Sequence, residues 1–423
     1  MKKMKKTLSM SFVLALVMAI FCSCTETKQE RSNTPICNYL YGVEYDDYDF
    51  QAGVNFTEKR YKPAAAACSE VRKGNFVGRN LDWYINCDAA FVIKINHTDD
   101  HYASIGMGGC LPAFDDSLAS AGGVSPVYGM LPMATCDGIN EKGVYIGVNV
   151  MPTGETSFDQ SKWNTGAWGN GAAYTNPSSD KTYCVSYLTR VILDHASSLA
   201  DAKQLVESIN WYEPLNFPHE GGTQAFHWLI SDSVSSAVLE FIDNKPCFTE
   251  TTNINEPSYA TIMTNFTNKL MADEQLVQTT GCGYERWDLL HDSYADTPES
   301  FEGMQNLMQK VWYTKAYTTE IGDGFFFSEF VSPEFPAQEM YHNPDYKNNE
   351  AFAEMFKAQK ALFDDKSNWH TPTSTLWYTT HTVIYDIQKR ELRVMVHEGL
   401  DGQKEYYKAS LSESGFVKPV LVK

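Results

Sequence analysis

Residues 69–82, SEVRKGNFVGRNLD, form two β-prone runs around a glycine turn, and they predict a β-hairpin. The turn is expected at Lys73-Gly74 or one residue later, because glycine accepts positive φ. In the first register Cys68 lies opposite Arg79, and in the second Arg79 is its diagonal neighbour on the same face. Both registers place a guanidinium beside the thiol of Cys68.

A permanent cation beside Cys68 lowers the pKa of the thiol and raises its thiolate fraction. Asp82 lies on the opposite face by strand parity, so it reaches the thiol only through a bulge or at the end of the strand. Taken by itself, the run Ala64–Cys68 also fits an inert buried strand. The hairpin alone therefore leaves two interpretations of this cysteine.

A reactive Cys68 needs a base, and no histidine lies near it in the sequence. A folded partner such as His227 is one solution, as in papain-like sites. The other is an N-terminal nucleophile. If the Ala67–Cys68 bond is cut, the new α-amine has a pKa near neutrality and can act as base for its own thiol. The small alanines before Cys68 leave that bond accessible, which suits a processing site.

The N-terminus has the pattern of an export signal. Residues 1–23 are expected to be a signal peptide, with MKKMKK as its basic region and LSMSFVLALVMAIF as an apolar region too short to span a bilayer comfortably. Cys22-Ser23-Cys24 is similar to a bacterial lipobox, so Cys24 is expected to be lipidated, with plain secretion as the alternative. Either route predicts an exported protein, as a cell-envelope lipoprotein or in the periplasm. Residues 24–67 are expected to be a tether and pro-segment.

The composition excludes several classes of partner and site. The formal net charge of −19 argues against nucleic acid, which needs a basic surface, and against an anionic membrane surface as electrostatic partner. Neither HExxH nor a paired Cys/His motif occurs, so no metal or other cofactor is implied. The absence of GxSxG disfavours a serine hydrolase.

The chain has ten cysteines and no CxxC pair, so neither a zinc ribbon nor a thioredoxin-like site is expected. Six of them remain when Cys22, Cys24, Cys37 and Cys68 are set aside. They are expected either as disulfides of an oxidising envelope or as buried apolar thiols, and the sequence leaves both open. The six are Cys87, Cys110, Cys136, Cys184, Cys247 and Cys282.

Residues 68–423 are expected to form one catalytic domain that mixes strands and helices. The strands are expected at the alternating or β-branched runs 91–95, 144–150, 237–242, 376–387 and 392–396, with a hairpin turn at 388–391. Helices are expected at 182–195, at 199–209 behind a capping box of Ser198 and Asp201, at Thr297-Pro298 with Pro at N1, and at 349–362. Strand clusters separated by helices predict helices packed on antiparallel sheets.

Four segments carry a family resemblance. They are Cys68 followed by GNFVGRNLD, DGINEKGVYIGVNV (137–150), AFHWLISD (225–232) and MTN (263–265). In this order they resemble the choloylglycine hydrolase family of N-terminal-nucleophile (Ntn) hydrolases, and more loosely the acid ceramidase and N-acylethanolamine amidase relatives. The similarity runs from Cys68 to near the C-terminus. It implies an α+β fold, a four-layer αββα sandwich of two antiparallel sheets.

The resemblance also implies a role for each matching residue. Cys68 is the nucleophile, and its α-amine is the base. Asp82 holds that amine, and Arg79 supports the thiolate. The side chain of Asn265 and the backbone N–H of Asn149 form the oxyanion hole.

Arg286, in GCGYERWDLL, matches a further arginine of the family. Its spacing from Asn265 is shorter than in the family, and this segment is more similar to the ceramidase-side relatives. The neighbouring polar residues have simpler interpretations, since Asn140 and Glu141 are expected to shape a turn and His227 to pack structurally.

The implied reaction is hydrolysis of a linear amide through a thioester on Cys68. The acyl part is expected to be bulky and apolar, either bile-salt-like or a fatty acyl chain. Asn149 stands where penicillin acylases tend to carry tyrosine, so penicillin V is the less favoured alternative. The expected partner is a small-molecule N-acyl amide, with membrane contact only through the N-terminal lipid and a second copy of the chain as an optional partner. A non-catalytic envelope lipoprotein that binds glycans or lipids is an alternative of a different class, which predicts an uncut chain and an unreactive Cys68.

Overall fold

The structure is a computed structural model, and it describes the chain in several segments. These are residues 32–37, 40–51, 67–84, 89–111, 131–152, 172–212, 224–242, 244–275, 283–319, 325–330, 338–341, 376–396, 405–413 and 419–421.

The first of two large sheets has nine strands in the order β1-β2-β5-β6-β7-β8-β12-β13-β14. All neighbours are antiparallel except β2 and β5, which are parallel. Its strands are β1 (Ser32–Cys37), β2 (Leu40–Tyr45), β5 (Ala89–Ile95), β6 (Ser104–Leu111), β7 (Thr135–Asn140), β8 (Tyr145–Pro152), β12 (Gln224–Ser231), β13 (Ser236–Ile242) and β14 (Lys245–Thr251).

The second large sheet has ten strands, with the main order β15-β3-β4-β19-β16-β17-β18 and with β20, β21 and β22 branching from β19. Its strands are β3 (Ala67–Lys73), β4 (Phe76–Tyr84), β15 (Ile262–Met263), β16 (Tyr313–Thr319), β17 (Phe325–Phe330), β18 (Gln338–Tyr341), β19 (Leu376–Asp386), β20 (Glu391–Val396), β21 (Glu405–Ser410) and β22 (Pro419–Leu421). A small third sheet joins β10 (Thr182–Cys184), β11 (Asn210–Tyr212) and β9 (Ala172–Tyr174).

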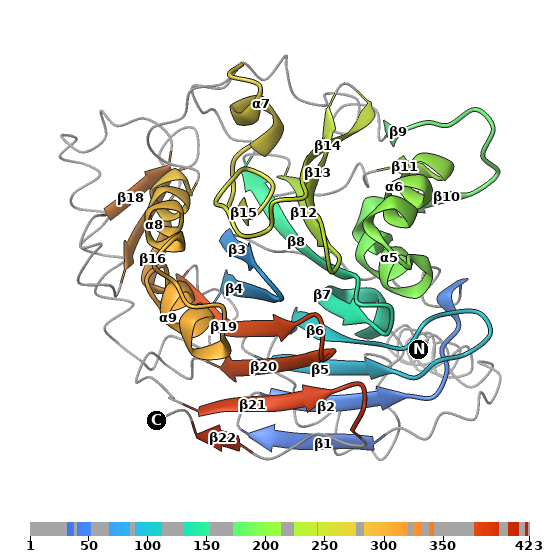
Figure 1. Cartoon of the computed structure of the whole chain (residues 1–423), viewed down its shortest axis with the longest axis horizontal. Helices are drawn as coiled ribbons and strands as arrows, with labels where there is room; N and C mark the ends of the chain where they lie inside the picture. Colours follow the sequence, from blue (N-terminus) through green and yellow to red (C-terminus); the bar gives the residue numbers. More distant parts are fainter. Residues whose placement is uncertain are drawn as a thin grey trace, which may run out of the picture.

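Helices cover the outer faces of both large sheets (Figure 1). Helices α5 (Leu188–His195) and α6 (Leu199–Ser208) pack on β7, β8 and β12, whereas α8 (Tyr284–Tyr294) and α9 (Phe301–Gln309) pack on β3, β4, β15 and β19. Short helices are α7 (Asn268–Ala272), η2 (Leu131–Ala134) and η4 (Val185–Tyr187). The expected four-layer αββα sandwich is confirmed.

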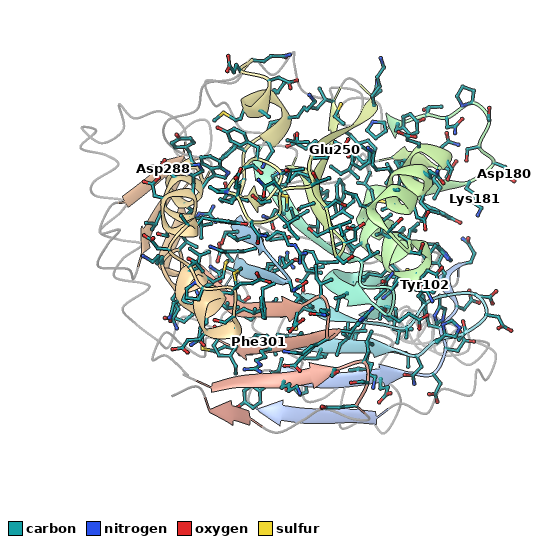
Figure 2. All side chains as sticks on the ribbon, viewed as in Figure 1. Tyr102, Asp180, Lys181, Glu250, Asp288 and Phe301 are labelled. Atoms are coloured by element: carbon teal, nitrogen blue, oxygen red, sulfur yellow. The ribbon has the colours of Figure 1, made fainter. Side chains whose placement is uncertain are left out.

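The apolar core between the sheets is built from both of them, and side chains fill the space between the layers (Figure 2). Val92 and Ile139 come from the first sheet, and Val383 and Val394 come from the second. All four are almost completely buried, so the mixed core holds the two sheets face to face.

The expected strands are confirmed as β5, β8, β13, β19 and β20, and β19 and β20 form the expected hairpin. The helix expected over 182–195 is wrong in its first half, because residues 182–184 pair with β11 and the α-helix begins only at Leu188. The pairing of Thr182–Cys184 with a neighbouring strand overrides helical spacing there.

Of two helix starts expected from the sequence, the structure confirms the cap of one and moves the other. Ser198 is the N-cap of α6 and accepts from the N–H of Asp201, as expected, but the Asp201 carboxylate accepts from Ser197 instead of Ser198. The helix expected from Thr297-Pro298 starts later, because Ser300 is the N-cap of α9 and accepts from the N–H of Gly303. The helix expected at 349–362 lies outside the described residues.

Part of the segment expected to be a tether and pro-segment belongs to the sandwich. Strand β1 forms the edge of the first sheet, and β2 pairs in parallel with β5 (Figure 1). Leu40, Val43 and Tyr45 of β2 are fully buried. Strands β1 and β2 therefore extend the same sheet as β5, although they precede Cys68 in the chain.

Within the described residues, no helix has the length and apolar character needed to cross a membrane. Among the described residues, Cys68 and Cys136 are free thiols. The Cys184 sulfur accepts from the Ser186 hydroxyl, and the Cys247 thiol donates to the carbonyl of Lys245.

Candidate active site

The β3–β4 hairpin turns at Gly74-Asn75, which is the second of the two expected registers. Gly74 has φ +55°, as the first central residue of a type II′ turn requires. Cys68 consequently pairs with Leu81, and Glu70 pairs with Arg79. Since Cys68 lies two residues before Glu70, all of these side chains share one face of the hairpin.

The Arg79 guanidinium is the centre of this face. Its Nη2 donates to the carbonyl of Val148, 2.6 Å away, and lies 3.8 Å from the Cys68 Sγ. Its Nε is 3.1 Å from Glu70 Oε1, and its Nη1 is paired with Asp137. The expected arginine beside the thiol is therefore confirmed, and its planar fork joins β3 and β4 to β7 and β8 of the facing sheet.

Two tyrosines complete the network around this guanidinium. The Tyr145 hydroxyl donates to Glu70 Oε2 at 3.0 Å, and the Tyr385 hydroxyl donates to Asp137 Oδ1. Glu70, Arg79 and Asp137 are all fully buried. Buried carboxylates and guanidinium thus satisfy one another through hydrogen bonds and ion pairs, as buried charges must.

Burial controls the protonation of the thiol. It raises the pKa of Cys68 to about 12, although Arg79 and the backbone N–H of Asp82 both lower it. Burial also opposes the charge on Arg79, but the nearby Cys68 and Glu70 outweigh it and leave the pKa of Arg79 above its ordinary value. In the uncut chain Cys68 therefore holds its proton at neutral pH.

Arg286 links three parts of the site on the other side of the hairpin. Its Nη1 donates to the carbonyl of Cys68 at 2.9 Å and lies 3.4 Å from Asp82 Oδ2. Its Nη2 donates to Asn265 Oδ1. Gly283, the N-cap of α8, has φ +79°, and a Cβ there would lie 2.8 Å from Arg286 Nη2. The first turn of α8 therefore depends on glycine to admit this arginine.

Asp82 lies on the face opposite the thiol, as the parity argument expects. It pairs with Ala67 in β3, and its Oδ1 accepts from the Thr379 hydroxyl at 2.6 Å. A bulge does occur at this level, but in the neighbouring strand β19, between Thr379 and His381. Asp82 therefore lies beside the backbone of residues 67 and 68, where cleavage would create the α-amine.

Asn265 lies two residues after the end of β15, which pairs with β3 at Glu70 and Val71. Its Oδ1 accepts from the backbone N–H of Cys68 at 3.3 Å. Asn149 reaches the same segment from the facing sheet, since its Nδ2 donates to the carbonyls of Met263 and Thr264 at 3.3 and 3.2 Å. The sequence-predicted residues therefore surround Cys68 from both sheets and from α8.

His227 is a structural residue rather than a base for Cys68. Its Nε2 donates to the carbonyl of Thr264 at 2.8 Å, and its Nδ1 lies 3.3 Å from Glu240 Oε1. Both ring nitrogens are thus engaged, and the pair holds the strand end that leads into Asn265.

The turn expected at Asn140 and Glu141 is also present. Asn140 Oδ1 accepts from the N–H groups of Lys142 and Val144, and its Nδ2 donates to the carbonyls of Leu193 and Ala196. This asparagine therefore shapes the β7–β8 connection and joins it to α5.

Sequence reasoning missed the roles of Glu70 and Asp137. Glu70 could have been found from the hairpin, because the second register places it directly opposite Arg79. Asp137 lies within the segment 137–150, but nothing local predicts its pairing with an arginine 58 residues away.

The site therefore presents a buried thiol with an adjacent guanidinium, a carboxylate that shares Arg286 with the Cys68 carbonyl, and two asparagines, one on β8 and one just after β15. Such a set suits nucleophilic attack on a carbonyl carbon.

Comparisons with known proteins give one family and several solved structures. The sequence model of the choloylglycine hydrolase family, described as linear amide C–N hydrolases, matches residues 67–283. A penicillin V acylase from Agrobacterium tumefaciens is similar in structure, with 12% identity, a TM-score of 0.42, and coverage of 82% of this chain and 86% of that one. A mutant of conjugated bile acid hydrolase from Clostridium perfringens gives 13% identity, a TM-score of 0.39, and coverage of 82% and 93%. No curated protein sequence matches this chain.

Proposed function

Because this chain belongs to the choloylglycine hydrolase family of linear amide C–N hydrolases, we propose that it cleaves an N-acyl amide through a thioester on Cys68. The observation that carries the proposal is the contact of the Cys68 thiol with Arg79, together with the bond from the Cys68 N–H to Asn265. The Asp82 carboxylate, which shares the Arg286 guanidinium with the Cys68 carbonyl, supports it further.

The proposed mechanism starts with cleavage of the Ala67–Cys68 bond. The freed α-amine takes the thiol proton, and the thiolate attacks the amide carbonyl carbon. The tetrahedral intermediate collapses, the C–N bond breaks, and the protonated α-amine gives its proton to the leaving amine. Water, deprotonated by the same amine, then attacks the thioester and releases the carboxylic acid with the free thiol. Arg79 stabilises the thiolate, and Asp82 orients the amine.

The oxyanion hole in this proposal consists of the Asn265 side-chain amide and the Asn149 backbone N–H. The bond from Cys68 N–H to Asn265 Oδ1 supports the first assignment, because it holds the Asn265 amide beside Cys68. Removing one such donor typically raises the barrier by about 3–4 kcal/mol.

Replacing Asn265 by alanine is therefore expected to lower kcat roughly 10²–10³-fold with a smaller change in KM. Steady-state kinetics on the processed enzyme checks this. Asn80→Ala is the matched control. Asn80 is a buried asparagine of the β3–β4 hairpin, and its side chain is hydrogen-bonded to the carbonyl of Met308 and the hydroxyl of Thr382. A kcat loss of equal size in both variants would refute a specific role for Asn265.

The acyl group is proposed to be bulky and apolar, as in a bile-salt-like or fatty N-acyl amide. Hydrolysis of glycine- and taurine-conjugated bile acids, N-acyl amines and penicillin V should be compared by release of the free amine. The names of the similar structures, a penicillin V acylase and a conjugated bile acid hydrolase, make these the first substrates to test. Exclusive cleavage of penicillin V would contradict the proposed acyl class.

The segment before Cys68 is expected to remain bound after processing. Strands β1 and β2 continue the first sheet, and burial of Leu40, Val43 and Tyr45 stabilises that contact. Native mass spectrometry of processed protein should show both pieces in one particle, and denaturing conditions should separate them. Loss of the N-terminal piece during gel filtration would contradict this prediction.

The same preparation distinguishes the two routes of cleavage. A Cys68→Ala chain that stays intact when produced alone indicates self-cleavage, and one that is still cut after Ala67 indicates a second protease. We also propose that residues 1–23 direct export and that Cys24 carries a lipid, which cell fractionation of wild-type protein and a Cys24→Ser variant tests.

A further inference from the structure

One buried guanidinium serves two carboxylates and the thiol. Arg79 contacts Glu70 through Nε, Asp137 through Nη1, and Cys68 through Nη2. With both carboxylates ionised, this fully buried group carries a net negative charge before Cys68 gives up its proton. Because uncompensated buried charge is costly, ionisation of Glu70 and ionisation of Cys68 oppose each other.

Glu70 is held in a prepared position. Strand periodicity places it on the thiol face, its Oε2 accepts from the Tyr145 hydroxyl, and its backbone pairs with Arg79. Gly147 of the facing sheet makes the space, since a Cβ there would lie 2.5 Å from Glu70 Oε2 and would also overlap the Tyr145 hydroxyl. The carboxyl is therefore part of a built site.

The surroundings of Glu70 come from five strands. Arg79 faces it from β4, Asp137 and Cys136 from β7, Tyr145 from β8, Tyr385 from β19 and Cys68 from β3 itself. Arg72, on the same face of β3, instead donates to the carbonyl of Asp232.

Glu70 is the described group of this site that titrates near neutrality. Burial raises the pKa of Glu70 to about 7, and Arg79 and the Tyr145 hydroxyl hold it from rising further. Burial raises the pKa of Cys136, and it raises those of Tyr145 and Tyr385 well above their ordinary values. Glu70 therefore changes its charge between pH 6 and 8, and in the processed enzyme the α-amine of Cys68 also titrates near neutrality.

We propose that Glu70 is a positioning residue that acts through Arg79: neutral Glu70 leaves the guanidinium to the Cys68 thiolate, and ionised Glu70 draws it away. This inference rests on the proposed role of Cys68 as nucleophile. The sign follows from the charges, since Glu70 is neutral below about pH 7 and anionic above it, and the anion raises the pKa of Cys68. Activity is therefore expected to decline as the pH rises through the pKa of Glu70, and this decline is the alkaline limit.

The test compares wild type with Glu70→Gln, which keeps the shape of the side chain and removes its charge. The pH profile of kcat/KM for wild type is expected to fall above about pH 7, roughly tenfold by pH 9, and the variant is expected to lose this fall. The rate of Cys68 alkylation by iodoacetamide is also measured against pH. The curve of the variant is expected to lie about one pH unit to the acid side of the wild-type curve.

Tyr145→Phe gives a second, independent variant. It removes a hydrogen bond that lowers the pKa of Glu70, so the alkaline limit is expected to move to higher pH. Asp194→Asn is the control, because Asp194 is a buried carboxylate paired with Arg190 elsewhere in the molecule, and it should leave the limit in place. If Glu70→Gln does not fold, the shift in Tyr145→Phe still decides the matter.

An unchanged alkaline limit and an unchanged alkylation curve in Glu70→Gln, or an unmoved limit in Tyr145→Phe, would overturn the inference. Alkylation reports the thiolate of Cys68 whether or not any amide is turned over. A chain that hydrolyses no amide but shows the shifted alkylation curve therefore refutes the proposed function and supports the role of Glu70.

Discussion

Replacing Cys68 by alanine is expected to abolish amide hydrolysis, with kcat reduced on the order of 10⁵–10⁶-fold. Cys68 is the only described cysteine that contacts both Arg79 and, through its backbone N–H, Asn265. Without its sulfur no thioester forms, and the remaining polar groups can only bind and orient the substrate. Cys68→Ser is expected to retain little more, because a hydroxyl gives up its proton far less readily than a thiol.

The measurement is release of free amine, with thermal unfolding as a check on folding. Cys247→Ala is the matched control, since Cys247 lies on β14 and its thiol donates to the carbonyl of Lys245, and it is expected to keep wild-type kcat. In the processed wild-type enzyme, loss of activity on alkylation should follow the fraction of Cys68 that is labelled, located by peptide mapping, and not the labelling of Cys136 or Cys247. The alkylation experiment uses processed wild-type protein, so it does not depend on whether the Cys68→Ala chain is cleaved. Activity that survives full labelling of Cys68 would refute the nucleophile assignment.

Replacing Arg79 by glutamine is expected to have the largest effect on stability and a large effect on activity. The change leaves Glu70 and Asp137 buried without their cation. Removing one partner of a buried ion pair typically costs about 3–5 kcal/mol. The thiolate also loses the only cation that contacts it among the described residues.

The loss of stability should depend on pH in a defined direction. Without Arg79 the pKa of Glu70 rises further in the folded state, so ionisation of Glu70 opposes folding as the pH increases. Arg79→Gln is therefore expected to lie closer to wild type at pH 5 than at pH 8. Urea unfolding at both values measures this, and an equal loss at both would count against the buried-charge explanation.

Arg190→Gln provides the control for this variant. Arg190 is likewise buried, its Nε donates to Asp194 at 2.8 Å, and its Nη2 donates to Ser104 at 2.7 Å. Arg190→Gln is expected to lower the free energy of unfolding about as much as Arg79→Gln does, while its folded molecules keep the wild-type kcat. If both arginine variants lose activity equally per folded molecule, Arg79 has no role beyond holding the fold.

Local pattern was enough to predict strands β5, β8, β13, β19 and β20, the Cys68 hairpin and the arginine beside the thiol. The errors have different causes. Residues 182–184 joined a sheet through β11, which is a contact outside the local spacing. Helix α9 begins at Phe301 instead of Thr297-Pro298, because Ser300 caps it through the N–H of Gly303. Charge and composition could not indicate that β1 and β2 complete the first sheet, since that depends on which edge is available to them.

The sequence by itself determined which side chains share a face around Cys68. Alternation along a strand is a property of the local backbone, so Arg79 had to lie beside the thiol and Asp82 behind it. Only the tertiary structure decided what meets them there. Asp137 and Arg286 come from positions 58 residues from Arg79 and 218 residues from Cys68, and packing of two sheets and a helix brings them together. Their burial then sets the charge that each group can hold, because a pKa depends on the whole surroundings of a group and not on its neighbours in the chain.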